Sequence, residues 1–174
     1  MTELNSVDAY GLPVGLLGRH SDEFYGAVGR VVCVCAVLED QITTLRHTLA
    51  GASQGQFTHQ PVKVQIDAAR TLACRVPAAA AGVIVAFLDE AANAFSRRND
   101  LAHSSFPAQP DGRIWGHRPA RDRTVTDGRA DTVETNVEAI LELIGELSAL
   151  VGRFSQVHAT ASPVSAPVGI ETMP

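Results

Sequence analysis

Residues 21–51 read SDEFYGAVGRVVCVCAVLEDQITTLRHTLAG, and this stretch decides the fold. Its apolar residues recur in alternating steps of four and three: Phe24, Val28, Val31, Cys35, Leu38, Ile42, Leu45 and Leu49. That spacing places one continuous apolar face along a long α-helix. Ser21 is a favourable N-cap, the acids Asp22 and Glu23 suit the first turn, and Gly51 ends the helix.

Two further helices are expected in the middle of the chain. The shorter one runs from Pro61 to Val76, and the next runs from Pro77 to His103. The inward positions of the longer helix are predicted to be Ala80, Ile84, Phe87, Leu88, Ala91 and Phe95.

An irregular segment, residues 106–130, precedes the last predicted helix. Within it, residues 113–116 and 124–126 are predicted to form the two strands of a short hairpin. Asp131 and Glu134 form a capping-box pattern, which predicts that the last helix begins there and continues to His158. Its apolar positions are predicted to be Val133, Val137, Ile140, Ile144, Leu147, Val151 and Phe154.

These patterns predict an all-α protein, a four-helix bundle with an irregular or β-hairpin insertion before the last helix. Residues 1–20 are expected to form an irregular lead-in and residues 21–158 the bundle. Residues 159–174, rich in Ser, Pro and Thr, are expected to be a disordered tail. The long apolar seams of the first and last helices also favour self-association as a homodimer.

Composition narrows the class of protein. The 174 residues carry a net charge of −5, which argues against a protein that coats nucleic acid non-specifically. The three cysteines match neither a disulfide framework nor a zinc pattern and are expected to be buried free thiols. The apolar run 76–88 contains Pro77 and Gly82 and is too short to span a bilayer. With no secretory signal evident, a cytoplasmic location is expected.

The motif that carries chemistry is Arg98-Asn99-Asp100-Leu101-Ala102-His103, at the end of the third helix. Asn99 and His103 are four residues apart, so they share one helix face, and Arg98 flanks them. A cation, an amide and an imidazole in this arrangement can bind a phosphate and move a proton. Arg153 and His158 have the same Arg-to-His spacing at the end of the last helix, so the spacing alone is not specific.

A helical bundle whose late core helix ends in Arg-Asn-x-x-x-His resembles the HEPN superfamily (higher eukaryotes and prokaryotes nucleotide-binding domains). The similarity in fold covers residues 21–158, and the specific motif covers Arg98 to His103. The resemblance implies a metal-independent endoribonuclease, often dimeric, with the two motifs meeting at the subunit interface. It also implies a place in a toxin–antitoxin or phage-defence system, with an antitoxin protein as partner.

The residue types fit cleavage of RNA by its own 2′-OH. His103 is the expected base or acid, Arg98 the expected contact for the phosphate oxygens, and Asn99 a support that orients the imidazole or binds substrate. No metal or cofactor is expected. The products would carry a 2′,3′-cyclic phosphate and a 5′-hydroxyl.

A basic segment follows the motif. Residues 97–129 contain seven Arg and four Asp, a local charge of +3. Phe106 is expected to stack on bases. The residues predicted to contact the RNA substrate are Arg97, Trp115, His117 and Arg118.

A non-enzymatic alternative accounts for the same residues. In this interpretation the motif is a polar helix end, and the bundle is a dimeric scaffold or a module that binds RNA or a nucleotide without cutting it. A plain helical protein whose motif arose by chance is the third interpretation.

Overall fold

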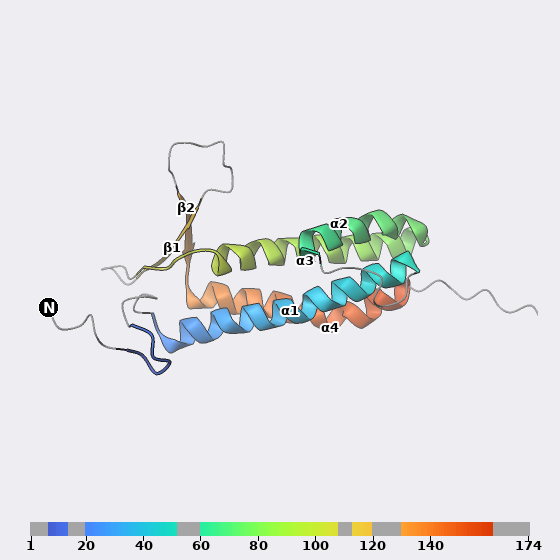
Figure 1. Cartoon of the computed structure of the whole chain (residues 1–174). Coiled ribbons are helices and arrows are strands. Elements are labelled where there is room, and N and C mark those ends of the chain that lie inside the picture. Colours follow the sequence, from blue (N-terminus) through green and yellow to red (C-terminus); the bar gives the residue numbers. More distant parts are fainter. Residues whose placement is uncertain (1–6, 14–19, 52–59, 108–112, 120–129, 162–174) are drawn as a thin grey trace, which may run out of the picture. The chain divides into compact units, whose positions relative to one another are not determined.

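The computed structural model of the chain describes residues 7–13, 20–51, 60–107, 113–119 and 130–161. Within these ranges the fold is mostly helical with one small antiparallel sheet (Figure 1). The elements in chain order are α1 Asp22–Ala50, α2 Val62–Leu72, the 3-10 turn η1 Ala73–Arg75, α3 Ala78–Ala102, β1 Ile114–Pro119, β2 Ala130–Thr135 and α4 Val137–Ala161.

The chain divides into two compact units. Unit 1 comprises Met1–Val37 and Asn93–Ala149, and unit 2 comprises Leu38–Ala92 and Leu150–Pro174. Each boundary falls inside a helix, so α1, α3 and α4 each contribute residues to both units.

The start and phase of α1 confirm the sequence prediction. The Phe24 amide donates a hydrogen bond to Ser21 Oγ at 3.2 Å, which caps the first turn. At the other end Gly51 has a φ of +64°, a left-handed conformation that glycine adopts without strain. Val28 is half-buried, and the other residues of the predicted stripe are buried: Phe24, Val31, Cys35, Leu38, Ile42, Leu45 and Leu49.

The prediction of buried thiols is right only for Cys35. Cys33 and Cys74 are exposed, and none of the three cysteines forms a disulfide. Two residues along a helix correspond to a rotation of about 200°, so burying Cys35 turns Cys33 to the opposite face.

The predicted hairpin is partly confirmed. Its first strand is β1, and the structure pairs it antiparallel with β2. Trp115 lies opposite Glu134, and His117 lies opposite Thr132. The predicted second strand, residues 124–126, lies outside the described residues.

The capping box predicted at Asp131 and Glu134 is wrong, because both residues belong to β2. Pairing with β1 favours an extended chain here, and β-branched residues suit it: Thr132, Val133 and Thr135. The cap of α4 is instead Asn136, whose Oδ1 accepts a hydrogen bond from the Ala139 amide at 2.7 Å. The helix therefore begins at Val137.

We expect Asn136→Ala to lower the free energy of unfolding by about 0.5–2 kcal/mol, the usual cost of removing an N-cap side chain. Urea denaturation measures this change. Asn93→Ala is a matched control, because Asn93 is exposed in the interior of α3 and has no cap to lose. Equal stability of the Asn136 variant and the control would contradict the assignment of the cap.

Unit 1 contains the first part of α1, the end of α3, the hairpin and the start of α4 (Figure 1). Arg97 on α3 donates through Nη1 to both carboxylate oxygens of Glu146 on α4, each at 2.6 Å. The apolar core of this unit is formed by Phe24, Ala27, Val31, Cys35, Ala94, Phe95, Leu101, Ile140, Leu143 and Leu147. The apolar pattern of α4 predicted Ile144 as an inward position. In the structure Leu143 is buried and Ile144 is half-buried.

Unit 2 contains α2, η1 and the remaining parts of the three long helices. The Thr43 hydroxyl on α1 donates to Gln65 Oε1 on α2 at 2.7 Å, and Arg70 on α2 pairs with Asp89 on α3 at 2.6 Å. The helix α4 continues to Ala161, three residues beyond its predicted end, and residues 162–174 of the predicted tail lie outside the described residues.

Among the described helices, α3 is long and apolar enough to cross a membrane by length and composition. The core helix of a soluble protein meets the same criterion. Three large side chains of α3 are buried in unit 2: Ile84, Phe87 and Leu88. They give this helix a core face.

Candidate functional site

The predicted motif occupies the last turns of α3, in unit 1. Arg98 and Asn99 are half-buried, and Arg98 Nη1 donates a hydrogen bond to Asn99 Oδ1 at 2.9 Å. Among the described residues, no partner bonds the buried Nε of Arg98. The side-chain amide of Asn99 thus holds the Arg98 guanidinium through one nitrogen. The guanidinium has further N–H groups that can donate to another acceptor.

His103 lies one residue beyond α3 and is exposed. Its backbone amide still donates to the Asn99 carbonyl oxygen at 3.1 Å, so the helical hydrogen-bond pattern extends to this residue. No described residue forms a side-chain hydrogen bond with the imidazole. Asn99 Oδ1 therefore contacts Arg98 and, among the described residues, Asn99 does not bond the His103 imidazole. Binding of substrate by Asn99 stays a prediction.

Asp100, in the middle of the motif, connects it to the hairpin. Its carboxylate accepts a hydrogen bond from Arg118 Nη1 on β1, and only 13% of the Arg118 side chain is exposed. The Asp100 side chain is 35% exposed, so the ion pair is partly buried and is screened less by salt than a surface pair. Arg118, predicted as a substrate contact, thus positions β1 beside the end of α3.

A short ladder joins the segment after His103 to β1. The Ser105 amide donates to the His117 carbonyl oxygen at 2.9 Å, and the His117 amide donates back to Ser105 at 2.8 Å. Alternation along β1 then separates the side chains. Gly116 and Arg118 share the face toward Asp100, and Trp115 and His117 lie on the other face.

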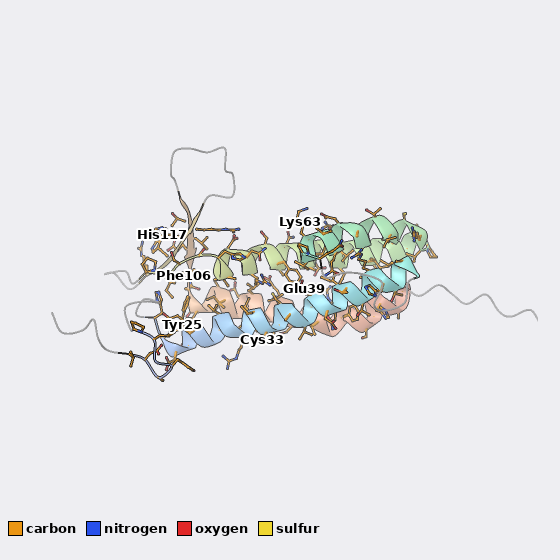
Figure 2. The ribbon with its side chains drawn as sticks, viewed as in Figure 1. Tyr25, Cys33, Glu39, Lys63, Phe106 and His117 are labelled. Atoms are coloured by element: carbon orange, nitrogen blue, oxygen red, sulfur yellow. The ribbon has the colours of Figure 1, made fainter. Side chains whose placement is uncertain are left out.

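Gly116 allows the closest approach at this junction. A Cβ atom added there would lie 2.7 Å from Phe106 Cε1 and 2.8 Å from Ser104 Cβ. Figure 2 shows Phe106 and His117 near the base of the hairpin. The ring of Phe106 therefore packs against the backbone of β1, and its expected stacking on bases stays a prediction.

We expect Gly116→Ala to destabilise unit 1 by about 1–3 kcal/mol, since the new methyl group overpacks this contact. Gly145→Ala on α4 is the control, because a Cβ there meets nothing within 4 Å and alanine is the better helix former. Thermal unfolding of both variants checks the prediction. A Gly116 variant as stable as the Gly145 variant would show that the close approach is absent.

An aromatic cluster at the start of α1 packs against Phe106. The rings of Phe24 and Phe106 are 5.4 Å apart, and His20 lies 4.8 Å from Phe24. His20 Nε2 is also 2.7 Å from the Phe106 carbonyl oxygen. Tyr25 joins the cluster 5.4 Å from Phe24, and burial raises the pKa of its phenol. This cluster is not predictable from the sequence, because no local pattern links residues 20–25 to Phe106.

The other predicted substrate residues differ in their burial and in whether their side chains already have a bonding partner. Arg97 is occupied by Glu146, Trp115 is half-buried, and His117 is exposed with no described side-chain partner. Of the remaining arginines in the basic segment, Arg113 is described and has an interaction partner. The others lie outside the described residues: Arg121, Arg123 and Arg129.

Unit 2 contains a cavity of about 570 Å³ that none of the predicted site residues line. Its walls come from the ends of α1 and α4 and from the connection between α2 and α3. They are mainly small and apolar, with Arg75 as a charged member. Gly51 and Ala161 are the last described residues before two undescribed ranges, and both line the cavity.

In the part of the chain that the structure describes, no three His, Cys, Asp or Glu side chains gather as metal ligands. Comparisons with protein-family models, with curated proteins and with solved structures give no match for this chain.

Proposed function

We propose that this chain is an endoribonuclease of the HEPN type that cleaves RNA by 2′-OH transesterification without a metal ion. The observation that carries the proposal is the hydrogen-bonded pair Arg98 and Asn99 in the last turns of α3, followed by the exposed imidazole of His103. The HEPN-like character of the helical fold is part of the same proposal.

Each residue has a distinct role in the proposed reaction. His103 accepts the proton of the 2′-hydroxyl, and a positioned base of this kind contributes about 10²- to 10⁴-fold to the rate. Arg98 donates hydrogen bonds to the non-bridging phosphate oxygens, where negative charge grows in the transition state. Asn99 is a positioning residue, because its Oδ1 holds Nη1 of Arg98.

The proposal also covers the partners of the chain. RNA is the substrate, and a homodimer, a cytoplasmic location and an antitoxin partner follow from the sequence patterns and the family resemblance. The ion pairs of Arg97 and Arg118 restrict the direct contacts with RNA, since both guanidinium groups already bind carboxylates.

Those two ion pairs favour a second candidate function. If the basic residues around the motif serve mainly to hold α3, α4 and the hairpin together, the chain is a helical module that binds RNA or a nucleotide without cleaving it. Binding of RNA with no cleavage is the result that this alternative predicts.

The proposal is tested by incubating the protein in EDTA with a single-stranded RNA and with a DNA of the same sequence. We expect cleavage of the RNA and none of the DNA, because DNA lacks the attacking 2′-hydroxyl. Cleavage of the DNA as well as the RNA would contradict the transesterification mechanism. Binding of intact RNA would favour the non-catalytic module.

A further inference from the structure

The hairpin brings the backbone of a second histidine, His117, near the end of α3. Ser105 and His117 exchange both backbone hydrogen bonds, so their Cα atoms are about 5.5 Å apart, as in any such antiparallel pair. His103 is two residues before Ser105, a distance of at most about 7 Å along an extended chain. The Cα atoms of His103 and His117 therefore lie within about 13 Å of each other.

The two imidazoles are also accessible. Both residues are exposed, and neither side chain has a hydrogen-bond partner among the described residues. His117 lies on the face of β1 opposite Gly116, which packs against Phe106 and Ser104. Its ring is therefore directed away from this contact, and the backbone ladder with Ser105 fixes its position.

We infer that His117 is the general acid of the cleavage reaction, acting in the same subunit as the base His103. The inference rests on the proposed function. It gives the hairpin a catalytic role, since β1 places His117 near the end of α3.

The proton transfers balance in a single step. His103 takes the proton of the 2′-hydroxyl as the 2′-oxygen bonds to phosphorus. The bond from phosphorus to the 5′-oxygen breaks, and protonated His117 gives its proton to that leaving oxygen. The products are a 2′,3′-cyclic phosphate and a 5′-hydroxyl. Exchange with water then returns both imidazoles to their starting states.

The inference is tested with two RNA substrates that differ at one atom. One has the natural bridging 5′-oxygen at the cleavage site, and the other has a bridging 5′-sulfur, which leaves as a thiolate and needs no proton. We expect His117→Ala to cut the oxygen substrate about 10²- to 10⁴-fold more slowly. On the sulfur substrate the same variant should cleave within about tenfold of the unaltered chain, because the protonation that it lacks is no longer needed.

Two further variants make the result specific. His103→Ala should remain slow on both substrates, since the attacking hydroxyl still needs a base. Thr132→Ala, opposite His117 on β2, is the control for a mere disturbance of the hairpin and should leave both rates unchanged.

A His117 variant slowed equally on both substrates, or on neither, would overturn the role of His117 while the proposed function stands. Failure of the unaltered chain to cut either substrate would overturn the proposed function and this inference together.

Discussion

Replacing His103 by alanine is expected to lower the rate of RNA cleavage by about 10²- to 10⁴-fold, the contribution typical of a positioned general base. The structure gives a reason to expect little loss of stability. His103 is exposed and lies beyond the last residue of α3, and no described residue bonds its imidazole. Single-turnover cleavage of an RNA oligonucleotide at saturating protein measures the rate.

The control is His158→Gln. Arg153 and His158 repeat the spacing of Arg98 and His103, but His158 lies within α4 and its Nε2 is 2.8 Å from the Thr48 hydroxyl. Glutamine retains a hydrogen-bonding group there, and we expect unchanged cleavage. Unimpaired cleavage by the His103 variant would show that another group is the base.

Replacing Phe24 by alanine is expected to lower the free energy of unfolding by about 3–5 kcal/mol, the usual cost of removing a buried aromatic side chain. Phe24 is 2% exposed and contacts the rings of His20, Tyr25 and Phe106. The loss leaves a cavity in the aromatic cluster and removes the side chain that holds Phe106.

Chemical denaturation followed by circular dichroism measures this effect, with Val32→Ala as the matched control. Val32 is on the same helix but is 45% exposed, so its truncation should change the stability by no more than about 0.5 kcal/mol. Similar losses in the two variants would contradict the placement of Phe24 in the core.

The helices were largely predictable, because each depends on a local pattern. The apolar stripe of α1, its N-cap at Ser21 and its end at Gly51 are all readable from residues close in sequence. The start of α4 was not, because Asp131 and Glu134 satisfy a helix-capping pattern while strand pairing with β1 decides their conformation. Strand pairing between residues 11 or more positions apart therefore outweighs the local capping pattern at the start of α4.

The contacts of the candidate site show the same difference between sequence neighbours and residues far apart in the sequence. Arg98, Asn99 and His103 are neighbours in the sequence, so their proximity follows from the helix itself. Asp100 is 18 residues from Arg118 and Arg97 is 49 residues from Glu146, and nothing in the local sequence selects those pairs. The sequence alone therefore assigned Arg97 and Arg118 to the substrate, while the structure pairs both with carboxylates.

The most direct test of the account is analysis of the ends produced when the purified chain cuts RNA in EDTA. We predict a 2′,3′-cyclic phosphate on one fragment and a 5′-hydroxyl on the other, because the 2′-hydroxyl of the substrate is the nucleophile. Fragments with a 5′-phosphate and a 3′-hydroxyl would show that water attacks instead. That result, or RNA that stays intact, would contradict a ribonuclease built on Arg98, Asn99 and His103.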